Sequence, residues 1–381
     1  MSVSNTKEKL NIAMFGHKRV PSREGGVEIV VEELSKRLTE MGNDVTLYNR
    51  RGKHVSDKSI ETEELSEYRG VKIKSVLTID KKGLAAVTSS FFATLKCVFS
   101  KAKVVHVHAE GPAAMTPFLK LFRKRVVVTV HGLDWQRDKW SEGFASKYIK
   151  LGEKMAVKFA DEIIVLSRRV QEYFKDTYNR ETVFIPNGVN EPEIKKAQLI
   201  CEHFSIEKDG YILFLGRLVP EKGVHLLIDA FKNVKTDKKL VIAGGTSDTF
   251  DYVKELHDKA FSDDRVIFTG FQQGQILEEL YSNAYIYTLP SLLEGMPLSL
   301  LEAMSYGNAC VVSDIAECAE VVEDKAVVVK AGDVTSLTQT LQKLCDDETL
   351  VNEYKSFSKD FILKKYNWDD VVEKTLALYE K

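Results

Sequence analysis

Short apolar runs alternate with amphipathic helical stretches along most of the chain. One such stretch places Val27, Val30, Val31, Leu34 and Leu38 on a single face of a helix. In the first half, the apolar runs predict buried strands at residues 10–16, 44–48, 104–108, 125–130, 162–166 and 182–185. Because strands that alternate with helices form parallel sheets covered on both faces, this half is predicted to be a doubly wound α/β domain.

A polar stretch from about residue 190 to residue 209 interrupts this alternation, which then starts again. The second series predicts strands at residues 211–216, 239–243, 266–269, 284–288, 309–312 and 326–329. We therefore predict two doubly wound, Rossmann-like domains that face each other across a cleft, with a hinge near residue 190. The domains are expected at residues 1–189 and 190–362, with a last helix at about residues 363–381 that packs back on the first domain.

The composition agrees with a two-domain protein of the cytoplasm. A chain of 381 residues exceeds the usual size of one core, and 44% hydrophobic with 29% charged residues is typical of a soluble protein. The net charge of −2 creates no overall field that would attract nucleic acid. The five cysteines form no Cys-x-x-Cys pair, which indicates reduced thiols, and we expect neither a secretory signal nor a membrane span.

The stretch from Ser291 to Gly307 carries the strongest chemical signal. It follows an apolar run, and Pro297 suits the first turn of a helix that ends near Gly307. The backbone amides of Gly295, Met296 and Leu298 would face an anion at the positive end of the helix dipole. A diphosphate fits such a position.

Two carboxylates accompany this helix start. Glu302, inside the helix, is suited to accept two hydrogen bonds from a ribose diol, and Glu294, in the preceding loop, would lie beside a sugar. The alternative is that Glu294 only complements the helix dipole and that Glu302 is a solvated surface residue.

Cations occur where the first strand of the second domain ends. Gly216 and Arg217 follow this strand, and Lys222 comes shortly after them. Ligands of open parallel sheets bind at the carboxyl ends of the strands, where Arg217 can contact phosphate oxygens in a fork and Lys222 can add a point charge. Two solvated surface cations are the alternative interpretation.

Two features of the first domain lie at comparable positions. Gly25 and Gly26 precede the first helix, where glycines allow close approach to a phosphate, although a simple turn explains them equally well. His131 follows the strand at residues 125–130 and is expected to face the cleft opposite Glu294, unless it only bonds a nearby carbonyl.

Together these motifs resemble family 4 of the retaining glycosyltransferases, which have the GT-B fold. The resemblance covers essentially the whole chain and is most specific where seven residues separate Glu294 from Glu302. It also rests on residues 17–26, 129–132, 185–189, 216–223 and 243–245. The loop that begins at His17 resembles members from bacterial surface-polysaccharide pathways.

For the donor, the resemblance implies a nucleotide sugar, expected to be a UDP-sugar, as co-substrate and no separate cofactor. Gly26, assisted by the other glycines and amides named above, would support the diphosphate, and Arg217 and Lys222 would neutralise it. Family members resemble one another in needing no metal, and the chain has no Asp-x-Asp motif that would hold one.

For the transferred sugar, the resemblance implies contacts from His131 and Glu294, with Glu302 on the ribose. The hypothesis is transfer with retained configuration to a glycan or lipid-linked acceptor in polysaccharide biosynthesis. The alternatives are a nucleotide-sugar epimerase of the same fold, an NAD-dependent oxidoreductase, which the incomplete glycine fingerprint disfavours, and a non-catalytic nucleotide-sugar-binding subunit.

Large apolar side chains and clustered cations occur together at residues 91–103 and 118–125. This composition is typical of a segment that lies on an anionic bilayer, where apolar burial and charge attraction add. The alternative is that ordinary core helices carry solvated cations. We expect a peripheral contact with the inner leaflet of the cell membrane, because acceptors in surface-polysaccharide assembly are usually lipid-linked.

Overall fold

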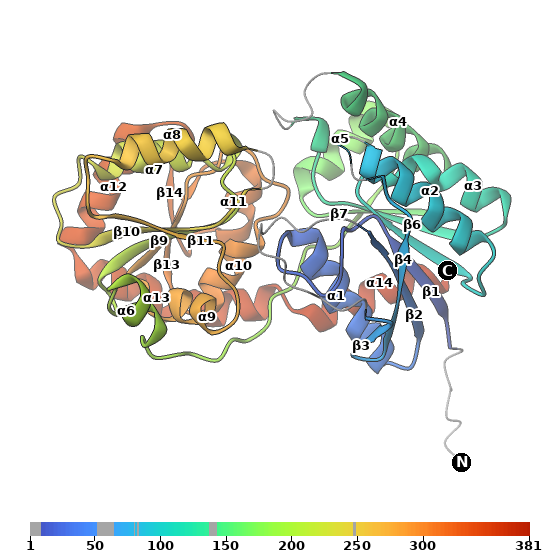
Figure 1. The fold of residues 1–381 in the computed structure, drawn as a ribbon, viewed down its shortest axis with the longest axis horizontal. Helices are drawn as coiled ribbons and strands as arrows, with labels where there is room; N and C mark the ends of the chain where they lie inside the picture. Colours follow the sequence, from blue (N-terminus) through green and yellow to red (C-terminus); the bar gives the residue numbers. More distant parts are fainter. Residues whose placement is uncertain (1–8, 52–64, 80, 82–83, 137–142, 247–248) are drawn as a thin grey trace, which may run out of the picture. The chain divides into compact units, whose positions relative to one another are not determined.

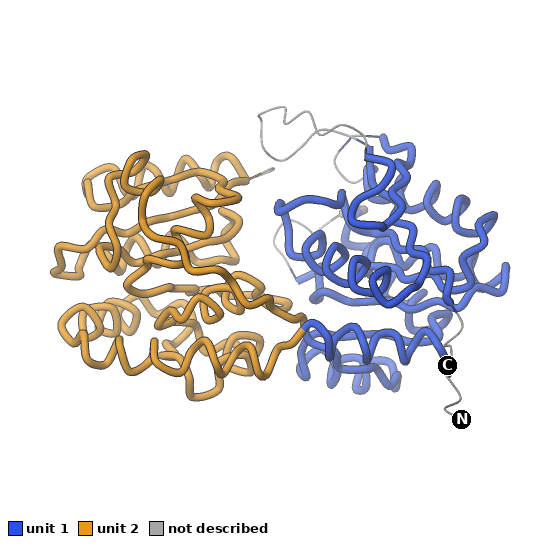
Figure 2. Tube along the Cα trace, turned by 90° about the horizontal axis from the view of Figure 1, so that it is seen from below, with its two compact units in different colours: residues 1–53, 60–186, 368–381 blue, residues 54–59, 187–367 orange. Residues whose placement is uncertain are grey.

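The computed structural model describes residues 9–51, 65–79, 81, 84–136, 143–246 and 249–381. The chain divides into two compact units (Figures 1 and 2). Unit 1 contains the described residues up to Pro186 together with residues 368–381, and unit 2 contains residues 187–367. From the sequence, the boundary is expected after residue 189 and the returning helix at about residue 363.

Unit 1 is built on a sheet that has eight strands in the described part of the chain, in the order β3-β4-β2-β1-β5-β6-β7-β8. All neighbours are parallel except β3 and β4. The strands are β1 (Asn11–Phe15), β2 (Asp44–Arg50), β3 (Glu67–Tyr68), β4 (Val71–Val76), β5 (Val104–His108), β6 (Arg125–Val130), β7 (Glu162–Val165) and β8 (Val183–Phe184). The helices are α1 (Gly26–Glu40), α2 (Leu84–Val98), α3 (Thr116–Leu121), α4 (Gly143–Phe159), α5 (Arg168–Tyr178) and α14 (Trp368–Glu380), with 3-10 turns η1 (Pro112–Met115) and η2 (Asp134–Gln136).

The two faces of this sheet bury different helices. Helices α2, α3, α4 and α5 cover one face, and α1 and α14 cover the other (Figure 1). On β1 and β5 the side chains alternate between the faces, so that Phe15 and Val107 pack under the first group of helices while His106 points toward α14. Unit 1 therefore has core on both sides of a doubly wound sheet.

Unit 2 has a sheet with six strands in the described residues, all parallel, in the order β11-β10-β9-β12-β13-β14. The strands are β9 (Tyr211–Leu215), β10 (Lys239–Ala243), β11 (Val266–Gly270), β12 (Ile286–Leu289), β13 (Ala309–Ser313) and β14 (Val327–Val329). The helices are α6 (Leu199–Phe204), α7 (Val224–Phe231), α8 (Phe250–Ala260), α9 (Gln275–Ser282), α10 (Leu298–Ser305), α11 (Ala316–Val322), α12 (Val334–Asp346) and α13 (Glu348–Lys365), with the 3-10 turn η4 (Pro220–Lys222). Helices α7, α8 and α12 cover one face, and α6, α9, α10 and α13 the other (Figure 1).

The doubly wound α/β class predicted from the sequence is confirmed in each unit. The strands β3 and β4 were not expected. Strand β4 buries Val71, Ile73 and Val76 but exposes Lys72 and Lys74, so it lacks the continuous apolar run that marks the central strands. Within the described residues, no helix is both long and apolar enough to cross a bilayer.

Helix α14 docks on unit 1 through polar as well as apolar contacts. The Nδ1 and Nε2 atoms of His106 lie 2.6 Å from the Tyr379 hydroxyl and 2.7 Å from Oγ1 of Thr129. The Nε–H of Arg125 donates to the carbonyl oxygen of Leu378 at 2.8 Å. These bonds give the docked helix a defined register on the sheet.

The histidines His17, His106 and His108 of unit 1 are buried. Burial lowers the pKa of His106 to about 3, with a smaller contribution from His131. Burial likewise lowers the pKa of His17 to about 4, although its Nε2 lies 2.9 Å from Oδ1 of Asn49. Both rings are neutral in the folded protein at neutral pH.

We expect acid to destabilise unit 1 well above the pH at which carboxylates titrate. Below about pH 6.5 the unfolded chain binds protons at His106 and His17, and the folded chain does not, so the free energy of unfolding falls by up to about 1.4 kcal/mol per pH unit for each histidine. Urea unfolding followed by tryptophan fluorescence, to which Trp135 and Trp368 of unit 1 contribute, measures this between pH 7 and pH 5. The variant His106→Gln should show a shallower pH dependence, and an unchanged slope would contradict the assignment.

Candidate functional site

The sheet order of unit 2 brings two chemically rich loops together. Strand β9 lies between β10 and β12. After β9 the chain adds β10 and β11 on one side of it, and then crosses to the other side to add β12, β13 and β14. Ligands of open α/β sheets bind at such a switch point, at the carboxyl ends of the strands. The loop after β9 carries Arg217 and Lys222, and the loop after β12 carries Glu294.

Backbone contacts join these two loops closely. Gly223 has a φ of +68°, and a Cβ atom there would lie only 2.1 Å from the carbonyl oxygen of Pro290. The amide of Leu292 donates to the carbonyl oxygen of Glu221 at 2.8 Å. Only glycine at position 223 permits both the backbone conformation and this approach.

An ion pair connects the same loops through side chains. Nζ of Lys222 lies 2.6 Å from Oε1 of Glu294, and the side chains are 12% and 7% exposed. The hydroxyl of Ser291 donates to the same carboxylate oxygen at 2.6 Å. Sequence reasoning placed both charged residues at the site but missed their pairing and the role of Ser291, which stands three residues before Glu294.

Arg217 and the glycine before it lie at the end of β9. The amide of Gly216 donates to the carbonyl of Ala243, and the amide of Leu218 donates to the carbonyl of Gly245, each at 3.1 Å. These bonds fix the backbone on both sides of Arg217, whose side chain is exposed. A guanidinium in this position is accessible to an anion.

Helix α10 begins at Leu298, so Pro297 precedes the helix instead of lying in its first turn. The first intrahelical bonds run from the amides of Leu300 and Leu301 to the carbonyl of Pro297. The amides before Leu300 therefore lie ahead of the helical ladder, as an anion site at a helix start requires. Among the other predicted donor contacts, Gly295 is buried, and Sδ of Met296 lies 3.0 Å from the amide nitrogen of Asn187.

Glu302 is held by a buried tyrosine. The hydroxyl of Tyr281 on α9 donates to Oε2 of Glu302 at 3.1 Å, and the ring of Tyr306 stacks on Tyr281 with centroids 5.2 Å apart. Burial, reinforced by the charge of Glu302, raises the pKa of Tyr281 well above its usual value, so this hydroxyl keeps its proton. The sequence offered no signal for this contact, because Tyr281 lies on a different helix.

His131 is found in unit 1, directly after β6. Its Nε2 lies 3.1 Å from Nδ1 of His108, the last residue of β5. Sequence reasoning missed His108, although its place at the carboxyl end of a strand next to β6 is the same signal that identified His131.

Gly25 and Gly26 also lie in unit 1, at the start of α1. A Cβ atom at position 25 would lie 2.4 Å from Oε2 of Glu28, whose other oxygen accepts a bond from the amide of Lys18 at 2.8 Å. The glycine therefore leaves room for Glu28 to fold back over the helix start. This is a structural reason for Gly25 that the sequence did not indicate.

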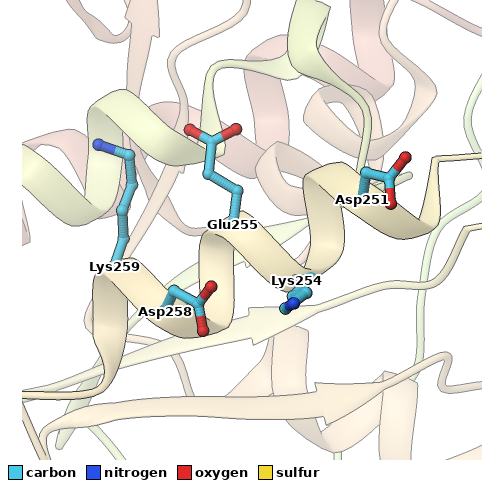
Figure 3. Close-up of a pocket in the computed structure, with 5 residues that line it drawn as sticks. All are labelled: Asp251, Lys254, Glu255, Asp258 and Lys259. Atoms are coloured by element: carbon cyan, nitrogen blue, oxygen red, sulfur yellow. The ribbon is translucent and has the colours of Figure 1, made fainter.

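A surface hollow of about 490 Å³ lies along α8, away from these residues (Figure 3). Its lining consists of Asp251, Lys254, Glu255, Asp258 and Lys259, all from this one helix. Both acidic and basic groups line it, and Lys259 pairs with Asp229 at 2.8 Å. The hollow contains none of the predicted site residues. Among the described residues, no group of three or more His, Cys, Asp or Glu side chains is placed to hold a metal ion.

Two curated relatives show what the chain is similar to. It is 26% identical to an uncharacterised glycosyltransferase of Methanocaldococcus jannaschii, over 97% of this chain and 98% of that protein. It is 25% identical to the N,N'-diacetylbacillosaminyl-diphospho-undecaprenol alpha-1,3-N-acetylgalactosaminyltransferase of Campylobacter jejuni, over 60% and 62% of the two chains. These similarities give no support to the epimerase alternative.

Solved structures share the fold at lower identity. Sucrose-phosphate synthase from Thermosynechococcus elongatus superimposes with a TM-score of 0.82 at 19% identity, covering 98% of each chain. The Anabaena protein HepE, solved in complex with UDP-glucose, superimposes with a TM-score of 0.78 at 18% identity, covering 96% of this chain and 99% of that one.

The family assignment covers both units. Residues 24–192 match the family described as Glycosyltransferase Family 4, and residues 195–374 match the family described as glycosyl transferases group 1. The resemblance inferred from the motifs is thereby confirmed. The chain belongs to family 4 of the glycosyltransferases, and it is a glycosyltransferase with the GT-B fold.

Proposed function

We propose that this enzyme transfers a sugar from a UDP-sugar to a glycan or lipid-linked acceptor in polysaccharide biosynthesis, with retained configuration and without a metal ion. The observation that carries the proposal is the cluster at the switch point of unit 2. There, a nearly buried Lys222–Glu294 pair, the exposed Arg217 and the first amides of α10 come from adjacent loops. The cations and N–H groups of this cluster can bind a diphosphate, and its carboxylate can bind a sugar.

The donor is held mainly by unit 2. Arg217, Lys222 and the amides at the start of α10 bind the diphosphate, and Glu302, oriented by Tyr281, accepts hydrogen bonds from the ribose diol. Glu294 contacts the transferred sugar. The fold shared with HepE, which was solved with UDP-glucose, supports a UDP-sugar as donor.

Transfer proceeds on one face of the sugar. The acceptor oxygen forms a bond to the anomeric carbon on the side from which the diphosphate departs, the bond between that carbon and the phosphate oxygen breaks, and the departing oxygen takes the acceptor proton. Arg217 and Lys222 stabilise the negative charge that grows on the diphosphate, so neither a protein base nor a metal is required. Unit 1 supplies His131, beside the transferred sugar, and the acceptor side.

Of these two acceptor classes we favour the lipid-linked one, which unit 1 would meet at the membrane. Support comes from an apolar and basic surface formed by α2, α3 and the loops that follow them, which we call the α2–α3 surface. Phe99 is 82% exposed, Leu121 is 75% exposed, and the rings of Phe99 and Phe122 lie with centroids 6.3 Å apart. The name of the Campylobacter relative, which includes a diphospho-undecaprenol acceptor, is consistent with this assignment.

Two of the cations on this surface have structural partners. Nζ of Lys120 pairs with Asp161 at 2.7 Å, and Nζ of Lys124 donates to the carbonyls of Ser100 and Ala102. Lys120 and Lys124 therefore stabilise the fold, as Arg125 does through its bond to Leu378. Lys101, Lys103 and Arg123 are exposed on the same surface, and because of this exposure we assign them to lipid contact.

Removing the leaving-group cations should abolish most of the activity. Arg217→Ala and Lys222→Met are each expected to lower kcat roughly a hundredfold or more, the usual effect of losing one such stabiliser. Product formation from a panel of nucleotide sugars measures this, with Lys254→Ala on α8 as the matched control. Lys222→Met also leaves Glu294 without its cation, so Arg217→Ala is the cleaner variant. Near-normal kcat in Arg217→Ala would refute the assignment.

The two glutamates should affect different kinetic parameters. Glu302→Gln keeps an acceptor for the Tyr281 hydroxyl but weakens the ribose contact, so KM for the donor should rise about tenfold while kcat changes little. Glu294→Gln should mainly lower kcat, because its carboxylate borders the reacting sugar. Steady-state kinetics, with Glu255→Gln as control, separates these effects, and equal changes in both parameters for both variants would show that the roles are wrongly assigned.

Among the cations of the α2–α3 surface, the exposed ones should carry the electrostatic part of membrane binding. Neutralising Lys101, Lys103 and Arg123 to Gln should weaken binding to vesicles with anionic lipid by about a hundredfold at low salt, since each cation near the surface contributes about 1 kcal/mol. Co-sedimentation measures this against a control in which Lys232, Lys235 and Lys254 of unit 2 are neutralised. If both triple variants bind equally well, or if the native protein stays in the supernatant, the α2–α3 surface is not a docking face.

A further inference from the structure

Three imidazole rings form a row across two neighbouring strands of unit 1. His106 and His108 lie on β5, with ring centroids 4.1 Å apart, and the His108 and His131 centroids are 5.4 Å apart. Because β5 pairs in parallel with β6, His108 lies opposite Thr129, and His131 follows Thr129 by two residues, directly after β6 ends. His106 and His108 are buried, whereas His131 is partly exposed.

His106, at the buried end of this row, is held by hydrogen bonds. Both ring nitrogens of His106 have hydroxyl partners, Tyr379 and Thr129, at 2.6 and 2.7 Å. His108 is bonded on one side only, since its Nδ1 lies 3.1 Å from Nε2 of His131 while its own Nε2 is buried and has no hydrogen-bond partner within the described residues. The three rings therefore have one well-defined hydrogen bond between them.

The middle ring is electrically neutral. Burial lowers the pKa of His108 well below its ordinary value, and the charged forms of His106, His131 and His17 would each lower it further. Among the described residues, no carboxylate contributes to raising it. A neutral imidazole has one N–H group and one bare nitrogen, so the question is which nitrogen of His108 carries the proton.

The unpartnered nitrogen decides the tautomer. In folded proteins, a buried N–H without an acceptor is rarer than a buried acceptor that lacks a donor. The bare nitrogen of His108 is therefore Nε2, and its proton is on Nδ1, from which it is donated to Nε2 of His131. Because Nε2 of His131 accepts this bond, the proton of a neutral His131 is on Nδ1.

We propose that His108 is a positioning residue that holds His131 in the tautomer protonated at Nδ1, so that His131 serves as a hydrogen-bond donor to an oxygen of the transferred sugar. The lone pair of Nε2 is engaged by His108, and Nδ1 already carries a proton. His131 in this state has no nitrogen with which to take the acceptor's proton. The proposal rests on the function assigned above to His131, and it agrees with a reaction in which the leaving group takes that proton.

The tautomer can be measured without substrate. Long-range proton–nitrogen correlation spectra of the full-length protein with 15N-labelled histidine distinguish protonated from bare ring nitrogens, and His131→Gln identifies the resonances of His131. At neutral pH we expect His131 to be protonated at Nδ1 and bare at Nε2. A proton found on Nε2 of His131 would overturn the proposal, whatever the activity of the enzyme.

Two variants of His108 test the cause. His108→Asn places an amide N–H close to the position of Nδ1, so the tautomer of His131 should be kept and kcat should fall less than about threefold. His108→Leu removes the donor, so His131 should show both tautomers and kcat should fall ten- to a hundredfold, the scale expected for a misoriented group at a reacting centre. An unchanged tautomer in His108→Leu would refute the role of His108.

The assays test the proposed function, and the spectra test the tautomer of His131, so either hypothesis can fail without the other. If no nucleotide sugar supports transfer, the proposed function fails, while the spectra still decide how His131 is protonated. If His108→Leu does not fold, the native spectrum and His108→Asn decide the question, because loss of the Nδ1 proton signal in the Asn variant would contradict the proposal.

Discussion

A nearly buried ion pair between Lys222 and Glu294 determines how the ligand edge of unit 2 is arranged. Removing two charges from water is costly unless they pair closely and their remaining bonding capacity is used, and Ser291 provides an additional bond to the carboxylate. The pair joins the loops after β9 and β12, which are neighbours only because of the strand order of the sheet. In the proposed reaction, the cation is consequently held in position before the diphosphate binds, and little reorganisation is needed when charge develops.

The central strands could be predicted because they are buried on both faces. In parallel sheets such strands read as continuous apolar runs, as in β5, β6, β10 and β13, and these were placed to within a residue or two. Strand β4 alternates between buried and exposed positions near one end of the sheet, and β3 has only two residues, so neither produces such a run. The start of α10 was placed too early, because a proline fits the residue before a helix as well as its first turn.

Residues of the candidate site could be predicted from the sequence where they follow the ends of strands. The residues that form hydrogen bonds with them could not. Positions such as His131 and Glu294 follow from one rule about parallel sheets and from family motifs. The groups that orient them, namely His108, Ser291 and Tyr281, are ordinary residues in the sequence. Their roles depend on distances of about 3 Å between elements, which are set by tertiary packing. Local sequence patterns do not contain that information.

The return of α14 to unit 1 has a consequence for the order in which the protein is synthesised. Residues 9–186 contain every strand of the first sheet, but the helix that bonds to His106 and Arg125 is translated only after residues 187–367. The growing chain therefore carries one sheet face without this cover during the whole synthesis of unit 2, which is contiguous and can fold in the meantime. The positions on α1 and β6 that α14 covers are exposed to solvent during that interval. This connectivity therefore requires the nascent chain to be protected until α14 has been made.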